Sequence, residues 1–182
     1  MCGAEVGSRV TAAWAALDQV MDPEVPVLSL RDLGVIRDVR MVDDDADPVL
    51  EVVVTPTYSG CPATEVIQQS IVDALEAARL GPVRLTMQRA PAWTTDWISA
   101  AGRDKLREYG IAPPGPVATG PDGAGLVPIR FMPRTGSAPA AVPCPRCGSA
   151  QTERLSAFGA TACKALYRCL ACREPFEHFK PI

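Results

Sequence analysis

The chain has 182 residues and a net charge of −3, and its 47% hydrophobic and 21% charged residues are ordinary for a globular protein. This length suits one medium domain or two small ones with a buried core. No stretch approaches the roughly 18 consecutive apolar residues of a membrane span, so we expect no membrane partner.

The charge is unevenly spread along the chain. Residues 143–182 hold six Lys or Arg and three Glu, which gives this region +3 and leaves −6 for residues 1–142. Nucleic-acid binding needs a basic face, and neither region supplies a convincing one. We therefore expect no nucleic-acid partner.

Seven cysteines are present, four of them in two Cys-x-x-Cys pairs. The first residues show neither the basic start nor the apolar core of a signal peptide. Both features are typical of a protein in the reducing cytoplasm. We expect the cysteines to serve metal binding or chemistry rather than disulfides.

A first helix is predicted from Ser8, a good N-cap, to Met21, because apolar residues recur between them at helical spacing. It should end at Asp22-Pro23-Glu24, since proline disfavours helical geometry in the residue before it. The two carboxylates that flank Pro23 fit a turn about as well as they fit a binding site.

Two strands, a second helix and a third strand are predicted next. Alternating apolar residues predict strands over 35–41 and 50–54, with an acidic hairpin loop at 43–48 between them. Apolar residues at helical spacing predict a helix over 62–78, and a last strand is expected over 83–87. This order is typical of a two-layer α+β domain in which helices cover one face of a small sheet.

The loop between the second strand and the second helix ends at Cys61. Pro62 suits the first position of a helix, which makes Cys61 the expected N-cap. Amide hydrogens and the positive end of the helix dipole would then favour the Cys61 thiolate, the form that binds metal or attacks electrophiles. Alternatively, Cys61 is a small hydrophobic residue at a buried corner.

A further helix is predicted from Thr94 or Thr95 to Tyr109, and one of Trp93 and Trp97 is expected in the core. Residues 110–142 contain seven Pro and six Gly, which is typical of a linker. We therefore predict an α+β domain over 1–109, a linker over 110–142 and a separate module over 143–182.

The tail carries the most specific motif of the sequence. Its two Cys-x-x-Cys pairs are separated by 21 residues, one more than the usual range of about 15–20, and they match a small zinc ribbon with the ligands Cys144, Cys147, Cys169 and Cys172. Iron or an iron–sulfur cluster would also suit four thiolates. About 40 residues are too few for a core of their own, so the metal should supply the folding energy. Cys163 and His178 are left over, and either could substitute as a ligand.

Three motifs of the first domain resemble the small α+β iron–sulfur assembly domain shared with SufT-type factors. They are Asp22-Pro-Glu24, Asp32-Leu-Gly-Val35 and Thr55-Pro-Thr-Tyr-Ser-Gly-Cys61-Pro62. The Trp93-Thr-Thr-Asp-Trp97 segment and the four-cysteine tail narrow the match, and nearly the whole chain is similar to the PaaD-like (PaaJ-like) family of phenylacetic acid degradation.

This resemblance implies a maturation role and not an enzyme. PaaD-like proteins accompany the multicomponent ring-1,2-phenylacetyl-CoA epoxidase, so its oxygenase and iron–sulfur reductase subunits are the implied partners, and a homodimer is left open. The resemblance places transient iron or an iron–sulfur cluster at Cys61, with Asp22, Glu24 and Thr57 as further handling residues. The alternatives are a structural or regulatory epoxidase subunit without metal transfer, and an enzyme with Cys61 as its nucleophile.

Overall fold

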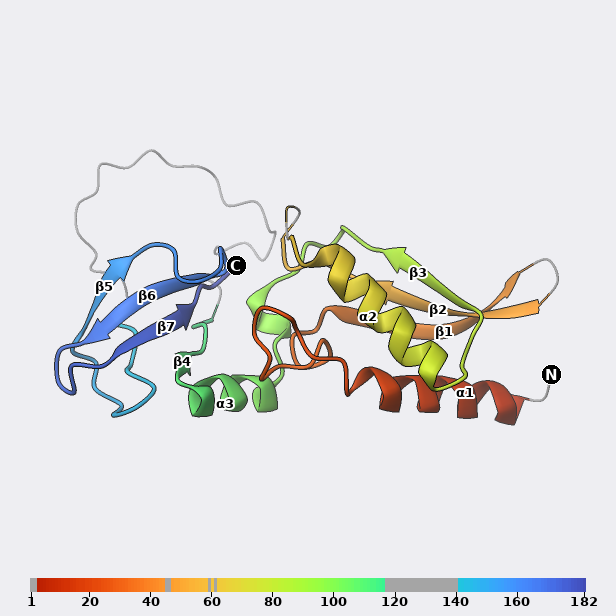
Figure 1. The fold of residues 1–182 in the computed structure, drawn as a ribbon, viewed down its shortest axis with the longest axis horizontal. Helices are drawn as coiled ribbons and strands as arrows, with labels where there is room; N and C mark the ends of the chain where they lie inside the picture. The colour runs from red at the N-terminus through yellow and green to blue at the C-terminus, as the bar shows by residue number, and fades with distance from the viewer. Residues whose placement is uncertain (1–2, 45–46, 59, 61, 117–140) are drawn as a thin grey trace, which may run out of the picture. The chain divides into compact units, whose positions relative to one another are not determined.

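The computed structural model describes residues 3–44, 47–58, 60, 62–116 and 141–182, and the chain divides into two compact units, residues 1–105 and 106–182. The first unit follows the predicted order, with α1 (Gly3–Leu17), β1 (Ile36–Asp44), β2 (Asp47–Val54), α2 (Thr64–Ala77) and β3 (Val83–Met87). Strand β2 pairs antiparallel with β1 and parallel with β3. Helix α2 runs across this sheet, and α1 packs against α2 and β1 (Figure 1). The predicted α+β class is confirmed.

The core of the first unit lies between the sheet and the helices. Leu50, Val52 and Val54 alternate along β2 and are at most 2% exposed, so one face of the central strand is fully covered. Helix α2 contributes buried residues at helical spacing, which are Ile67, Ile71 and Leu75.

Helix α1 begins and ends earlier than its sequence predicts. It already includes Gly3, so Ser8 is not its N-cap; no proline precedes Ser8 to stop the helix. At its other end, the N–H of Val20 donates to the Leu17 carbonyl at 3.1 Å, which tightens the last turn. Met21 then pairs with Ser29 in an isolated bridge. No helix in the described parts of the chain is both long and apolar enough to cross a membrane.

The helix predicted up to Tyr109 consists of two pieces, a 3-10 turn η1 (Thr95–Trp97) and α3 (Ala100–Tyr109). Thr94 caps η1, and extended backbone at Ile98 separates the two pieces. Trp93 is the core tryptophan: it is 4% exposed, and its indole N–H donates to the Leu33 carbonyl at 2.9 Å. Trp97 is half-buried.

The Asp32-Leu33-Gly34 motif has a structural role. Gly34 has φ +68°, and a Cβ atom there would lie 2.8 Å from the Trp97 carbonyl oxygen, so only glycine fits. The Asp32 carboxylate accepts hydrogen bonds from Ser29 and Ser99 at 3.1 Å and from the Lys105 ammonium at 2.6 Å. The motif therefore ties the turn after α1 to the start of α3.

Asp32→Asn should destabilise the first unit at neutral pH. Burial alone would raise the pKa of Asp32, but Lys105 and Ser29 outweigh it and hold that pKa below its usual value. The carboxylate contribution is therefore complete above the unfolded-state pKa of about 3.9 and is lost as the pH falls through the lower folded-state value. We expect a loss of about 1–2 kcal/mol at pH 7 that shrinks below about pH 4, measured by urea unfolding.

Asp18→Asn is the matched control for this prediction. The Asp18–Arg31 ion pair is exposed at the surface, so its loss should change stability by less than about 1 kcal/mol. Equal losses for the two variants, or a loss for Asp32→Asn that does not depend on pH, would contradict this role of the Asp32 carboxylate.

The second unit is a four-stranded sheet with the order β4-β7-β6-β5. Its strands are β4 (Ile111–Ala112), β5 (Thr152–Ser156), β6 (Lys164–Cys169) and β7 (Pro175–Phe179). Strand β4 pairs parallel with β7, and both of its residues are buried, so the chain already joins this sheet inside the segment predicted as a linker. Residues 117–140 of that segment lie outside the described residues.

Candidate metal centre and the loop before helix α2

Two tight turns of the second unit present the four tail cysteines. In the first turn, the N–H of Gly148 donates to the Cys144 carbonyl at 2.9 Å, and Gly148 has φ +73°. In the second, Cys169 ends β6 and its N–H donates to the Glu174 carbonyl at 3.0 Å. Each turn brings two cysteines to the same end of the sheet, as the Cys-x-x-Cys spacing predicts.

The four sulfur atoms form one compact group. All lie within 4.8 Å of one another, with 3.8 Å between Cys144 and Cys172 and 3.6 Å between Cys147 and Cys169. A disulfide would need about 2.05 Å, so these thiols are free. A tetrahedral ion with metal–sulfur bonds of about 2.3 Å separates its sulfurs by about 3.8 Å. The arrangement therefore fits a four-cysteine metal site.

The electrostatics of this group favour a bound cation. The backbone N–H of Cys172 donates to the Cys169 sulfur and lowers the pKa of that thiol to about 6. The Glu174 amide lowers the pKa of Cys172, but burial and the neighbouring thiols overcome this and raise it to about 12. The pKa values of these two thiols are therefore shifted in opposite directions. A divalent ion would hold all four as thiolates.

Two of the four cysteines also belong to a buried apolar cluster of the second unit. Cys144 and Cys169 are buried together with Ala112 and Phe176, and Val142 and Tyr167 pack against them. Strand β4 thus supplies part of the apolar shell around the metal site. A metal held by the four sulfurs would therefore adjoin this small cluster.

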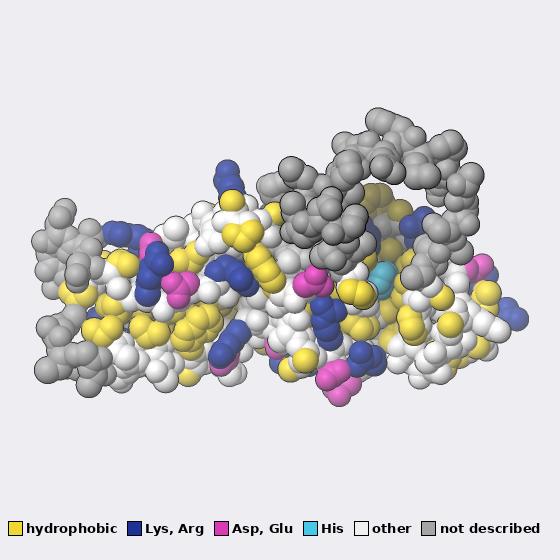
Figure 2. Space-filling model, turned by 180° about the vertical axis from the view of Figure 1, so that it is seen from behind, with side chains coloured by type: hydrophobic (Ala, Val, Ile, Leu, Met, Phe, Trp, Pro, Cys, Tyr) yellow, Lys and Arg dark blue, Asp and Glu magenta, His cyan; other side chains and the backbone are white. Residues whose placement is uncertain are grey.

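The two spare ligands of the sequence, Cys163 and His178, are not members of the four-sulfur group. The Cys163 sulfur lies 3.0 Å from the Thr161 hydroxyl. His178 lies on β7 with its ring edge against Tyr167, at 5.5 Å between centroids, and burial lowers its pKa. Figure 2 shows a histidine side chain (cyan) among hydrophobic side chains.

The start of α2 corrects one expectation about Cys61. The helix begins at Thr64, and its N-cap is Ala63, which makes no side-chain capping bond. Pro62 and Ala63 form a turn, and Ala63 is 8% exposed, so packing has placed the helix start two residues later. The N-cap argument for a Cys61 thiolate is therefore wrong. Cys61 itself lies outside the described residues.

The other predicted handling residues occupy two places. Asp22 is 7% exposed, and its Oδ1 accepts hydrogen bonds from the N–H groups of Glu24 and Val25 at 2.9 and 2.7 Å. This is the turn role that the sequence left open. Glu24 is half-buried beside it. Thr57 lies in the loop after β2, where it lines a small pocket.

The Thr57 pocket is apolar and leaves room for about one water molecule, with a volume of about 10 Å³. Its lining includes Gln68 of α2 and Met87 of β3, and the Gln68 side-chain amide lies 3.2 Å from the Met87 sulfur. Neither Asp22 nor Glu24 is among the described residues that line it. No spacing in the sequence connects Thr57 with Gln68 and Met87, because they come from three separate elements.

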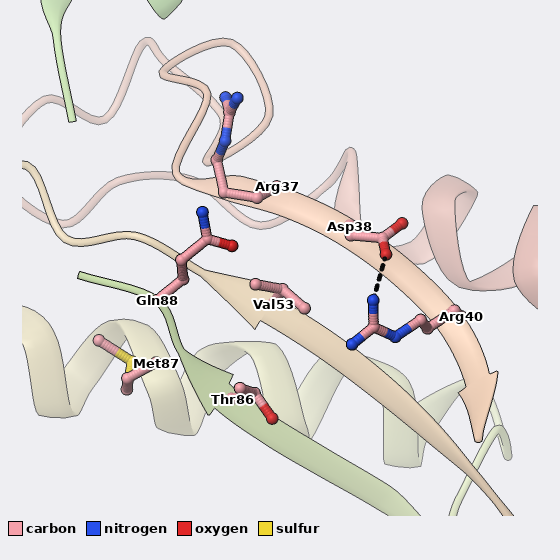
Figure 3. A pocket seen from close by; sticks show the side chains of 7 residues that line it. All are labelled: Arg37, Asp38, Arg40, Val53, Thr86, Met87 and Gln88. Atoms are coloured by element: carbon pink, nitrogen blue, oxygen red, sulfur yellow. Dashed lines mark hydrogen bonds and ion pairs between the residues drawn. The ribbon is translucent and has the colours of Figure 1, made fainter. Parts of the chain in front are cut away.

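A wider cavity of about 500 Å³ lies over part of the sheet, lined by residues of β1, β2 and β3 and by Gln88 (Figure 3). One of its two arginines, Arg40, is paired with carboxylates. The Arg40 guanidinium contacts Asp38 at 3.2 Å and Glu51 at 2.6 Å, and the Thr86 hydroxyl donates to Glu51 at 2.6 Å. Arg37 lies 3.6 Å from the centroid of the Trp97 ring. The carboxylate contacts compensate Arg40 and stabilise the sheet, whereas Arg37 forms an ion pair with no described carboxylate.

Two family models match the chain. One, described as an iron–sulfur cluster assembly protein, matches residues 11–84, and the other, described as the PaaD zinc beta ribbon domain, matches residues 131–180. The first range includes Asp22, Glu24, Thr57 and Cys61. The second includes all four clustered cysteines and begins inside the predicted linker.

One similar protein matches nearly the whole chain, and another matches about half of it. An Escherichia coli (strain K12) protein named "Putative 1,2-phenylacetyl-CoA epoxidase", with D as its subunit letter, is 45% identical over 174 residues, 96% of this chain and 94% of the relative. A Bacillus subtilis (strain 168) protein named "Fe-S protein maturation auxiliary factor YitW" is 35% identical over 94 residues, 52% of this chain and 81% of the relative. The crystal structure of a domain of unknown function, DUF59, from Bacillus anthracis covers 58% of this chain and 97% of its own, with a TM-score of 0.51 at 20% identity, which shows a shared fold.

Proposed function

This chain belongs to the PaaD-like family of 1,2-phenylacetyl-CoA epoxidase subunits, and from that membership we propose that it is an accessory maturation factor of the epoxidase. It would deliver iron or an iron–sulfur cluster to the oxygenase or reductase subunits. The observation that carries this proposal is that one chain combines two matches. Its first half matches an iron–sulfur assembly domain, and its full length matches an epoxidase subunit.

We assign the delivery step to the loop before α2. Cys61 would be the soft ligand for the transferred iron or cluster, and Thr57 lies in the same loop. One cysteine cannot complete a coordination sphere, so the remaining ligands would come from the client or a second copy. Asp22 would act through the turn that it caps, and Glu24 is the nearby carboxylate in that turn.

The ribbon would hold zinc as a structural ion. Four thiolates in a closed tetrahedral group leave no open position for a substrate, which is the pattern of structural zinc sites. In this role the metal folds the second unit, and the transferred iron or cluster is handled in the first unit.

A second reading is a structural subunit of the epoxidase, because the full-length relative is named as a subunit. An enzyme with Cys61 as its nucleophile is a weaker reading. Such a nucleophile usually needs a partner base. The only histidine of the chain, His178, belongs to the second unit and is buried against Tyr167.

The epoxidase made without this chain should contain less iron. We expect the oxygenase and reductase subunits to be produced in similar amounts with and without it, but with iron or cluster content reduced severalfold when it is absent. The measurement is iron and sulfide per purified complex, together with the visible absorption of the reductase. An unrelated iron–sulfur protein from the same cells is the control for general iron supply. Equal metal loading with loss of complex assembly would favour the structural-subunit reading.

A further inference from the structure

The second unit also contains a groove. Its volume is about 770 Å³, which lies in the range of binding sites. The floor comes from the sheet: Ala165 and His178 are cross-strand partners on β6 and β7, and Tyr167 follows on the same face of β6. Prolines line much of the rest, including Pro114 and Pro143.

The groove carries an excess of positive charge. Arg107, Arg154 and Lys180 line it, and the described lining residues include no carboxylate. Elsewhere in this unit, Lys164 pairs with Glu177 and Arg168 pairs with Glu153, so those cations are already compensated. Arg154 and Lys180 differ from these paired cations, because neither forms an ion pair with a described carboxylate.

The contacts of Lys180 keep its charge at this surface. Its ammonium lies 3.3 Å from the Ala157 carbonyl and 4.5 Å from the centroid of the exposed Phe158 ring. Neither contact neutralises it. An apolar floor with uncompensated cations at its margin is complementary to a bulky apolar side chain flanked by carboxylates.

We propose that this groove is the docking site for an acidic segment of an epoxidase subunit, with one aromatic or large aliphatic side chain of that segment seated over Tyr167. This inference rests on the proposed function, since it takes the client to be the epoxidase. The groove also depends on the metal centre, because Cys144 lines it and Tyr167 packs against the cysteine core. Docking and metal binding by the ribbon are therefore coupled.

A charge-reversal pair in the full-length chain tests the docking site. Arg154→Glu with Lys180→Glu should raise the Kd for the purified epoxidase complex by at least about ten-fold, because like charges would face the acidic segment. Arg79→Glu with Arg89→Glu is the matched control. It makes the same change in net charge on exposed positions of the first unit, and it should change Kd by less than about two-fold. Unchanged metal content in all variants shows that the ribbon is folded.

Cross-linking identifies the occupant of the groove. A photoreactive benzoylphenylalanine in place of Arg154 should cross-link to an epoxidase peptide rich in Asp or Glu, whereas the same residue in place of exposed Leu155 should not. Cross-links only to residues 117–140, whose neighbours Pro116 and Ala141 line the groove, or only to a second copy of the chain, would overturn the proposal. So would equal Kd values for the two charge-reversed pairs. If the wild-type chain still restores iron to the epoxidase in that case, the proposed function stands without this docking site.

Discussion

Cys169→Ser should unfold the second unit and leave the first unit folded. The Cys169 side chain is fully buried, and its sulfur is a member of both the metal group and the small core. A structural zinc ion contributes an apparent 10–16 kcal/mol in ribbon-sized domains, far more than so small a core supplies. Losing one of four thiolates should therefore cost nearly all of the stability of the second unit.

The matched control is Cys163→Ser. Cys163 is also buried, but its sulfur contacts the Thr161 hydroxyl and is not a member of the metal group. The measurement is zinc per chain by elemental analysis, together with backbone amide spectra that report each unit separately. We expect one zinc per chain and dispersed ribbon signals for wild type and Cys163→Ser, and neither for Cys169→Ser. Folded ribbon signals in a metal-free Cys169→Ser chain would show that hydrophobic packing alone holds the unit.

The clustering of the four tail cysteines could be predicted because each pair is local in sequence. A Cys-x-x-Cys turn brings two sulfurs together through its own backbone, so only the meeting of the two turns depends on tertiary structure. The α+β order could also be predicted, because β3 alternates apolar and polar residues and α2 has a clear apolar face. Both signals come from short-range periodicity.

Element boundaries were harder to predict, for identifiable reasons. Pro62 is a good first helical residue, yet packing of Ala63 moves the start of α2 to Thr64. Strand β4 has only two residues, so it has no period that a pattern could show. Its pairing with β7 joins it to residues more than 60 positions further along the chain.

The surroundings of the candidate sites could not be predicted from spacing. Thr57, Gln68 and Met87 meet at one small pocket from a loop, a helix and a strand. The groove of the second unit is also lined by cations that lie far apart in the sequence, which are Arg107, Arg154 and Lys180. The positive net charge of the tail could be read from the sequence, but which of its cations line the groove depends on how the sheet folds.

Cys61→Ser should abolish iron delivery while leaving this chain folded. Because Ala63 is the N-cap of α2, the substitution changes no capping residue, and we expect its effect on the urea unfolding of the first unit to be within about 0.5 kcal/mol. The hydroxyl is a poor ligand for iron in a sulfur environment, so the transferred iron or cluster would lose its soft ligand.

Cells with Cys61→Ser should accumulate epoxidase protein that is deficient in iron or in its cluster, and growth on phenylacetate should fail. Cys163→Ser is again the control, since it removes a thiol outside the metal group and outside the loop before α2. The decisive comparison is iron and sulfide per epoxidase complex, purified from cells with matched levels of the wild-type and variant chains. Equal metal loading and equal epoxidase activity for Cys61→Ser would rule out Cys61 as the delivery residue. The structural-subunit reading would then be favoured over delivery by Cys61.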